Sequence, residues 1–131
     1  MKNVILCVDD EKIILNSLKS ELKLEFGNEY IYETAENASD AEELIDELVL
    51  DGCKILIIVS DWLMPGIKGD EFLIKIHKKY PQIVKIMLTG HVADEAVNKA
   101  IKEANLHKCI AKPWSGEELM DAIKEGLSKI K

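Results

Sequence analysis

The chain contains 131 residues, carries a formal net charge of −7, and is 47% hydrophobic, which is typical of a globular domain and excludes a disordered chain. The longest uninterrupted apolar run, Ile55–Val59, is far too short to span a bilayer, and Asp9 follows the start too closely for a signal peptide. We therefore expect one domain over residues 1–131, located in the cytoplasm and not attached to a membrane.

The basic residues and the cysteines indicate which ligands and which cellular compartment suit this chain. Arginine, the residue that most often reads guanine, is absent, so we expect no direct nucleic-acid binding by this domain. Cys7, Cys53 and Cys109 are odd in number and form no C-x-x-C pair, which is typical of small core residues in a reducing compartment. A disulfide or a reactive thiol is the alternative interpretation.

Five short strands are predicted along the chain, each followed by a pattern of helical period. They are Val4–Val8, Ile31–Ala35, Ile55–Ser60, Val84–Leu88 and Lys108–Ala111.

Five helices are predicted from apolar stripes, with start and stop signals around them. Ser39 with Glu42 and Ser115 with Glu118 have the spacing of a capping box before the second and fifth helices. Stop signals follow the first three helices at Gly27–Asn28, Asp51–Gly52 and Tyr80–Pro81. The stripes are Ile14, Leu18 and Leu22; Leu44, Ile45 and Leu48; Phe72, Leu73 and Ile76; Val97, Ile101 and Ala104; and Leu119, Ile123, Leu127 and Ile130.

This alternation predicts a parallel sheet with helices on both faces. The first and third strands are almost wholly apolar and the fourth is nearly so, as expected for strands buried on both faces. The second and fifth strands carry polar residues, namely Tyr32, Glu33, Thr34 and Lys108, and therefore belong at the edges. The expected fold is a doubly wound, flavodoxin-like (βα)₅ sandwich with strand order 2-1-3-4-5.

Ligands of such sheets bind beyond the carboxyl ends of the strands, at the point where the strand order reverses. Here that point lies between the first strand, which runs into Asp9–Asp10–Glu11, and the third strand, which runs into Asp61. The fourth strand ends at Thr89–Gly90 and the fifth at Lys112–Pro113. We therefore expect carboxylates, a hydroxyl and an ammonium group to converge at one edge of the sheet.

Clustered carboxylates need a cation or a proton, because two of them ~4 Å apart repel by about 4 kcal/mol at an effective dielectric of 20. A set of oxygen ligands favours Mg²⁺ or Mn²⁺ over zinc. His77, His91 and His107 lie on separate elements, form no recognisable metal set, and are interpreted as surface or loop residues.

A Mg²⁺ ion held by few carboxylates keeps positions open for phosphate oxygens. Lys112 would supply a positive charge for a phosphoryl oxygen, and Thr89 a hydroxyl donor. A carboxylate can itself take a phosphoryl group as an acyl phosphate. The residues alone leave open which aspartate does so.

Four motifs carry a resemblance to a known family. They are Val8-Asp9-Asp10-Glu11, the run from Val59 to Gly66 (VSDWLMPG), the run from Met87 to His91 (MLTGH), and Ala111-Lys112-Pro113-Trp114. Together and in this order, they resemble the motifs of the receiver domains of bacterial two-component response regulators, over nearly the whole chain.

The resemblance implies that Asp61 accepts a phosphoryl group from a phosphohistidine of a sensor histidine kinase or a phosphotransfer protein. Asp10 and Asp61 would coordinate Mg²⁺ by their side chains and Asp9 through water. The backbone carbonyl of Leu63 would be a further ligand. The domain would catalyse only its own phosphorylation and dephosphorylation, and would be a switch and not an enzyme with turnover.

The resemblance also implies how the signal leaves the site. Lys112 would pair with the phosphorylated Asp61, the Lys112–Pro113 bond would be cis, and Thr89 would swing toward the phosphoryl group. Receivers usually carry an aromatic residue three positions before the lysine, where this chain has Cys109. A thiol cannot fill the volume of an aromatic ring, so we expect the usual coupling to Thr89 to be weakened or rerouted.

Four other residues lie in or beside the motifs, namely Leu63, His91, Trp62 and Trp114. Leu63 and His91 lie at positions that flank the phosphoryl group in this family and would tune its lifetime. Trp62 is either a partner contact or an exposed aromatic residue. Trp114 is interpreted as a packing residue at the start of the last helix. Receivers joined to many kinds of output carry tryptophan at this position, so it does not indicate which output this domain has.

The leading hypothesis is a phosphorylation-controlled interaction domain whose output face is formed by the fourth helix, the fifth strand and the fifth helix. Asn98, Lys99 and Lys102 are candidates for its exposed side, or else form a solvated helix face. The output partner or attached effector domain is not identified by the sequence. A homodimer formed on phosphorylation is a further partner that the resemblance allows.

Two alternative functions are an enzyme and a docking domain that is not phosphorylated. A small Mg²⁺-dependent aspartyl-phosphate phosphatase would need an Asp-x-Asp motif after the first strand, which Asp9–Asp10–Glu11 does not provide. Rapid turnover of p-nitrophenyl phosphate would support that alternative. A degenerate receiver used only for docking is disfavoured by the intact acidic, threonine and lysine positions.

Overall fold

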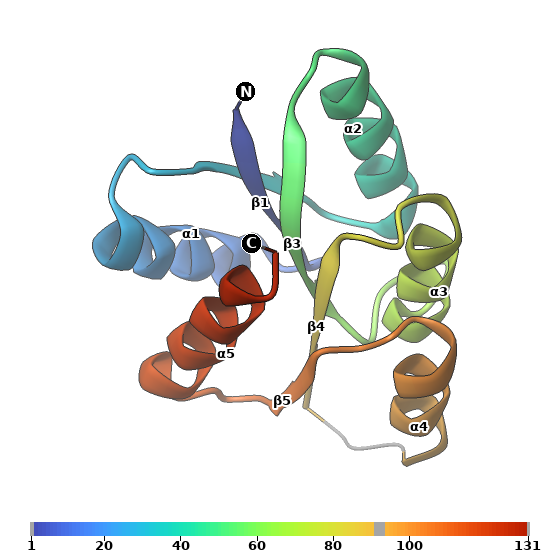
Figure 1. The fold of residues 1–131 in the computed structure, drawn as a ribbon. Coiled ribbons are helices and arrows are strands. Elements are labelled where there is room, and N and C mark those ends of the chain that lie inside the picture. The colour runs from blue at the N-terminus through green and yellow to red at the C-terminus, as the bar shows by residue number, and fades with distance from the viewer. Residues whose placement is uncertain (1, 91–93, 131) are drawn as a thin grey trace.

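The computed structural model describes residues 2–90 and 94–130, and strands and helices alternate along this part of the chain (Figure 1). The five predicted strands are confirmed. Two of them extend one residue further than expected at their carboxyl ends, so that Asp61 and Thr89 are the last residues of their strands. The strands are β1 (Asn3–Val8), β2 (Ile31–Ala35), β3 (Lys54–Asp61), β4 (Val84–Thr89) and β5 (Lys108–Ala111).

The strands form one parallel sheet in the order β2-β1-β3-β4-β5, as predicted. The central strands are buried over almost their whole length, whereas the edge strands β2 and β5 are buried at only some positions, and the two end residues of β5 are exposed. The register pairs Val8 with Ser60, Asp61 with Leu88 and Thr89 with Ala111. The carboxyl ends of four strands therefore meet at one edge.

The helices cover both faces of the sheet, with α1 and α5 on one side and α2, α3 and α4 on the other (Figure 1). Each face has its own apolar core, one built with Leu18, Leu22 and Ile123, the other with Ile45 and Phe72. No helix within the described ranges is long and apolar enough to cross a membrane. The helices are α1 (Lys12–Phe26), α2 (Ala38–Leu50), α3 (Gly69–Lys79), α4 (Asp94–Glu103) and α5 (Gly116–Ser128).

The predicted cap of α5 is confirmed, whereas that of α2 is wrong. Ser115 caps α5, because its side chain accepts a hydrogen bond from the backbone N–H of Glu118 at 3.2 Å. In α2 the cap is Asn37, which accepts from the backbone N–H of Asp40 at 2.8 Å. Ser39 already lies inside the first turn, because the helix begins at Ala38, whose side chain is buried in the core.

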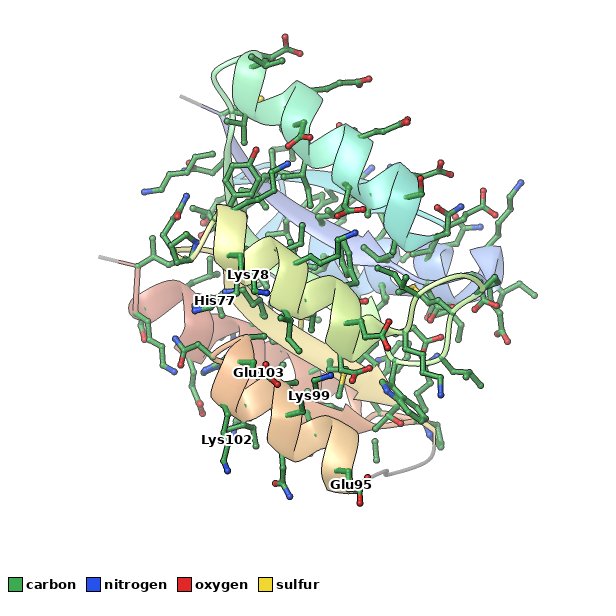
Figure 2. All side chains as sticks on the ribbon, turned by 90° about the vertical axis from the view of Figure 1, so that its right-hand side faces the viewer. His77, Lys78, Glu95, Lys99, Lys102 and Glu103 are labelled. Atoms are coloured by element: carbon green, nitrogen blue, oxygen red, sulfur yellow. The ribbon has the colours of Figure 1, made fainter. Side chains whose placement is uncertain are left out.

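The predicted apolar stripe of α4 is partly wrong. The helix packs against α3, Ala100 is buried in the core that α3 also lines, and Ala104 is buried just after the helix ends, while Ile101 is 52% exposed. Small alanine side chains allow close packing on this side, which leaves the larger Ile101 directed outward. Figure 2 views this side of the molecule and shows Lys99 and Lys102 on the outer surface of α4.

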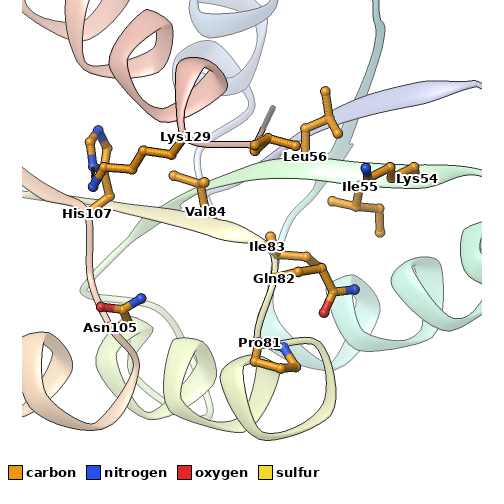
Figure 3. A pocket seen from close by; sticks show the side chains of 11 residues that line it. Lys54, Ile55, Leu56, Pro81, Gln82, Ile83, Val84, Asn105, His107 and Lys129 are labelled. Atoms are coloured by element: carbon orange, nitrogen blue, oxygen red, sulfur yellow. Dashed lines mark hydrogen bonds between the residues drawn. The ribbon is translucent and has the colours of Figure 1, made fainter.

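A pocket of about 340 Å³ lies at the amino ends of the strands, at the opposite end of the sheet from Asp61. Figure 3 shows His107 and Lys129 at one side of it. Nδ1 of His107 accepts a hydrogen bond from the Lys129 ammonium at 2.8 Å, and its Nε2 lies 3.0 Å from the carbonyl oxygen of Ala122. This histidine is thus a half-buried packing residue.

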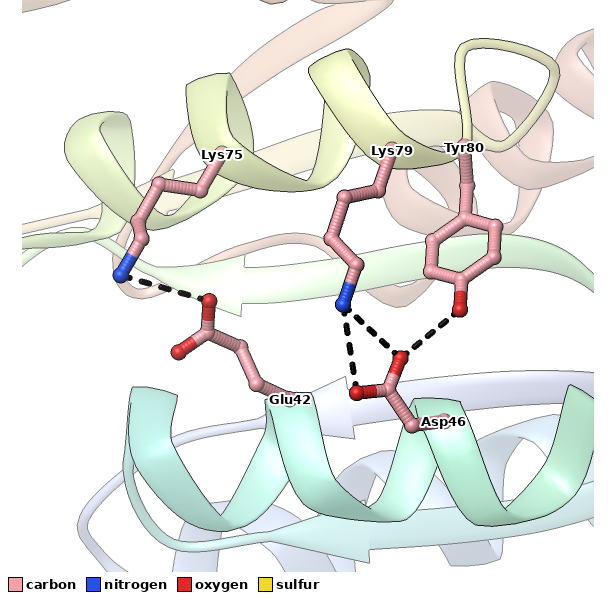
Figure 4. A network of polar contacts seen from close by, with 5 residues as sticks. All are labelled: Glu42, Asp46, Lys75, Lys79 and Tyr80. Carbon is pink, nitrogen blue, oxygen red and sulfur yellow. Dashed lines mark hydrogen bonds and ion pairs between the residues drawn. The ribbon is translucent and has the colours of Figure 1, made fainter.

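Polar contacts join α2 to α3 (Figure 4). The carboxylate of Asp46 accepts hydrogen bonds from the Lys79 ammonium at 3.1 Å and from the Tyr80 hydroxyl at 2.7 Å. The hydrogen bond from Tyr80 has the larger effect and that from Lys79 the next, and both lower the pKa of Asp46. Lys75 lies 3.4 Å from Glu42 one turn away. Such solvent-exposed pairs contribute little to stability, but they orient the two helices.

Candidate metal and phosphoryl site

The three predicted carboxylates converge at the carboxyl edge of the sheet. Asp9 and Asp10 follow β1, Asp61 ends β3, and one oxygen of each lies within 4.8 Å of the others. Asp9 and Asp61 are buried and Asp10 is exposed. The backbone of Asp9 is held by β2, since its N–H donates to the carbonyl oxygen of Ala35 at 3.1 Å. The cluster is therefore part of the sheet framework and opens to solvent on the side of Asp10.

Lys112 reaches this cluster from the end of β5. Its ammonium lies 3.0 Å from Oδ2 of Asp9 and 3.0 Å from Oδ1 of Asp61. Its backbone N–H donates to the carbonyl oxygen of Thr89 at 2.8 Å, which ties the loop to β4. The Lys112–Pro113 peptide bond is cis, as expected. One cation thus bridges the two buried carboxylates.

Burial and charge shift the pKa values of the central pair. Burial raises the pKa of Asp61, and the charges of Asp9 and Asp10 add to this, while the hydrogen bond from Lys112 opposes it. Burial lowers the pKa of Lys112, but its hydrogen bonds and charge interactions with Asp61 and Asp9 outweigh this, so its pKa is raised. Lys112 therefore stays protonated at neutral pH.

The residues fit a hard divalent cation. Three carboxyl groups lie together beside one ammonium, and the metal-ligand atoms that the described residues bring together are all oxygens, which favours Mg²⁺ or Mn²⁺. A bound cation would stabilise the ionised form of Asp61 against the effect of burial.

Thr89, Leu63 and His91 are also predicted to belong to the site. Thr89 is buried at the end of β4, on the same edge as Asp61. Leu63 follows Asp61 by two residues, and its side chain is 63% exposed. His91 lies outside the described residues.

Cys109 is half-buried in β5 and packs against the core below α2, α3 and α4. Burial raises its pKa, and burial with the charge of Asp9 raises the pKa of Cys7 to about 12, so neither thiol is activated as a thiolate. All three cysteines are free, which contradicts the disulfide alternative.

The two tryptophans are both tied to carboxylates. Trp62 is half-buried and its indole N–H donates to Oδ1 of Asp70 at 3.0 Å, so it is not a merely exposed aromatic residue. Trp114 packs against the core of the α1 and α5 face and donates to Oε2 of Glu21 at 3.0 Å. This contact agrees with the packing interpretation of Trp114.

Sequence reasoning missed a buried lysine. Lys85 in β4 is 1% exposed, and its ammonium donates to the carbonyl oxygen of Ile83 at 2.7 Å and to Nδ1 of His77 at 2.9 Å. His77 is half-buried at the end of α3, so its interpretation as a surface or loop residue is wrong, whereas His107 does lie in a loop, just before β5. The available signal was a lysine inside an otherwise apolar strand.

Fold and site define a flavodoxin-like α/β domain with a cluster of three aspartates at the carboxyl edge of its parallel sheet. The family model of the response regulator receiver domain matches residues 5–124, so the chain belongs to the receiver domains of two-component response regulators.

Relatives with this domain differ in overall length. The chain is 29% identical to the hydrogenase transcriptional regulatory protein HoxA of Cupriavidus necator over 94% of its own length, but it spans only 24% of that regulator. A CheY-like receiver domain from Methanospirillum hungatei is 31% identical with a TM-score of 0.86, covering 99% of this chain and 97% of that one. The beryllofluoride-activated NtrC4 receiver domain dimer is 34% identical with a TM-score of 0.84, covering all of both chains.

Proposed function

We propose that residues 1–131 form one receiver domain that takes a phosphoryl group on Asp61 in a Mg²⁺-dependent reaction. The donor is a phosphohistidine of a sensor histidine kinase or of a phosphotransfer protein. The observation that supports this proposal best is the convergence of Asp9, Asp61 and Lys112 from three strand ends, with Lys112 within 3.0 Å of both carboxylates.

In the proposed reaction a carboxylate oxygen of Asp61 attacks phosphorus, a P–O bond forms, and the P–N bond to the donor histidine breaks. Asp10, Asp61 and the carbonyl of Leu63 would hold the cation directly, and Asp9 would hold it through water. When bound, Mg²⁺ offsets the negative charge of the transferring phosphoryl oxygens. Lys112 then exchanges its contact with the carboxylate of Asp61 for one with the phosphoryl group. The domain is a switch that catalyses only its own phosphorylation and dephosphorylation.

Asp61→Asn is expected to abolish phosphorylation, because an amide oxygen is a far weaker nucleophile than a carboxylate. The wild-type chain, incubated with acetyl phosphate and MgCl₂, should gain the mass of one phosphoryl group in an intact-mass spectrum, and the variant should gain none. Omitting Mg²⁺ is the control for the cation. Equal phosphorylation of wild type and variant would place the acceptor elsewhere.

The proposed output face is formed by α4, β5 and α5, and it controls a partner or an attached effector domain. Asn98, Lys99 and Lys102 on α4 are exposed and available for such a contact. Figure 2 shows the two lysines. The similarity to a receiver domain dimer supports a second copy of this chain as one partner after phosphorylation. Sedimentation of the phosphorylated and unphosphorylated chain tests the dimer.

Thr89→Ala is expected to separate phosphorylation from signalling, since the hydroxyl of Thr89 is proposed to follow the phosphoryl group. The variant should still gain one phosphoryl group by intact mass. The phosphorylation-induced changes in the amide NMR signals of Lys108–Ala111 should become smaller than in the wild type. Changes of wild-type size would exclude Thr89 as the relay.

A further inference from the structure

The segment that follows Asp61 is anchored by an unusual set of contacts. The backbone N–H of Trp62 donates to the carbonyl oxygen of Leu88 in β4 at 2.8 Å, and its own carbonyl oxygen accepts from the N–H of Gly69 at 2.7 Å. The indole N–H donates to Oδ1 of Asp70, in the first turn of α3, at 3.0 Å. Trp62 is therefore fixed at three points to two different elements.

Asp70 is 7% exposed, so its carboxylate is buried at a cost that hydrogen bonds must offset. Its place in the first turn of α3 supplies favourable helix-dipole charge, and the indole N–H supplies a directed donor. Glu71, its neighbour in the same turn, is exposed. Helix stabilisation alone would be served by an exposed acid such as Glu71, and does not account for burying Asp70 against Trp62.

Leu63 follows Trp62 directly in the segment that these contacts hold. Its side chain is 63% exposed and does not anchor it, whereas Met64 on its other side is buried. The orientation of the Leu63 backbone is thus determined by its anchored neighbours, Trp62 above all.

We propose that the hydrogen bond between Trp62 and Asp70 aims the Leu63 carbonyl oxygen at the cation site, which makes Asp70 a positioning residue. This inference rests on the proposed function, because it assumes that the acidic cluster binds a divalent cation. Groups that orient metal ligands without touching the metal commonly affect metal affinity strongly.

The experiment measures Mn²⁺ affinity by electron paramagnetic resonance of the free ion, with urea unfolding of each variant alongside. Asp70→Ala is expected to weaken Mn²⁺ binding about tenfold, at the lower end of the effects of such orienting groups. Asp70→Asn keeps an acceptor oxygen and should bind within about twofold of the wild type. Glu71→Ala is the matched control, since it removes a charge from the same helical turn without touching Trp62.

A second variant guards against loss of folding in Asp70→Ala. Trp62→Phe keeps an aromatic ring but removes the N–H donor, and should weaken Mn²⁺ binding as much as Asp70→Ala does. Combining the two changes should then give no further loss.

The results test the positioning role of Asp70 separately from metal binding by the wild type. Asp70→Ala or Trp62→Phe binding Mn²⁺ as tightly as the wild type overturns the positioning role. Equal losses in Asp70→Asn and Asp70→Ala, or in Glu71→Ala, show that charge and not the hydrogen bond is responsible, and also overturn it. Absence of Mn²⁺ binding by the wild type instead overturns the proposed function on which the inference rests.

Discussion

Lys85→Met is expected to raise the free energy of unfolding by about 2 kcal/mol at pH 7. The Lys85 ammonium is buried in β4, and the partners recorded for it among the described residues, the Ile83 carbonyl and His77, are neutral acceptors at this pH. Burial lowers the pKa of Lys85 from 10.5 to about 8. At about 1.4 kcal/mol per pKa unit this shift corresponds to a cost of about 3 kcal/mol, of which the two lost hydrogen bonds offset about 1 kcal/mol.

The gain in free energy of unfolding from Lys85→Met should decrease as the pH rises. The pKa of Lys85 is lower in the folded protein than in the unfolded chain, so the folded state holds this proton more weakly. The cost is fully present below about pH 8, decreases as the pH rises, and is gone above about pH 10.5. Urea unfolding of wild type and variant at pH 7 and pH 10.5 measures the difference, and groups common to both proteins cancel.

Lys78→Met serves as the matched control, because Lys78 is an exposed lysine in α3, next to His77. It should change stability by less than about 0.5 kcal/mol at either pH. A further readout is His77, whose pKa is lowered by burial and by the charge of Lys85. Its pKa, followed by NMR, should move upward in Lys85→Met. Lower stability of Lys85→Met at pH 7 would show that the buried ammonium is stabilising.

Gly69→Ala is expected to lower the free energy of unfolding by about 3 kcal/mol, the upper part of the range for overpacking. A Cβ atom at Gly69 would overlap the backbone carbonyl oxygen of Asp61 and lie 2.8 Å from Cα of Trp62. Both are backbone atoms at the end of β3, so neither can rotate away as a side chain would. Either the start of α3 or the end of β3 must shift, and the shift at Asp61 should also weaken Mn²⁺ binding.

Two other glycines provide controls for Gly69→Ala. Gly90→Ala should leave stability within about 0.5 kcal/mol, because a Cβ there meets no atom of the described residues within 4 Å beyond its chain neighbours. At Gly126 in α5 a Cβ would lie 2.9 Å from a methyl group of Val84, which can adjust, and alanine favours the helix. Gly126→Ala should therefore cost less than Gly69→Ala in urea unfolding. Equal effects at all three positions would contradict an explanation based on the backbone of Asp61.

The strands and their order could be predicted because they depend on local patterns. Apolar runs and the polar residues of β2 and β5 distinguish central from edge strands, and right-handed parallel crossovers leave few arrangements. The same reasoning placed Asp9, Asp61 and Lys112 at one edge of the sheet, although the contact between Lys112 and Asp9 joins residues 103 positions apart.

Two of the wrong predictions concern the buried face of α4 and the cap of α2, which both depend on how helices and strands pack against one another. The face of α4 could not be chosen from its sequence, because both Ile101 and Ala100 fit a helical stripe, and close packing selected the smaller residue. The cap of α2 moved from Ser39 to Asn37 because Ala38 is needed in the core.

The sequence by itself determined the parallel sheet, its strand order and the set of polar residues at its carboxyl edge, because periodicity and topology confine these choices. Only the tertiary structure decided that Lys85 is buried with the neutral acceptors Ile83 and His77 as its partners among the described residues, that Trp62 is tied to Asp70, and that Gly69 lies against the backbone of Asp61. These contacts depend on the distance and orientation between packed elements, which no local pattern of residues specifies.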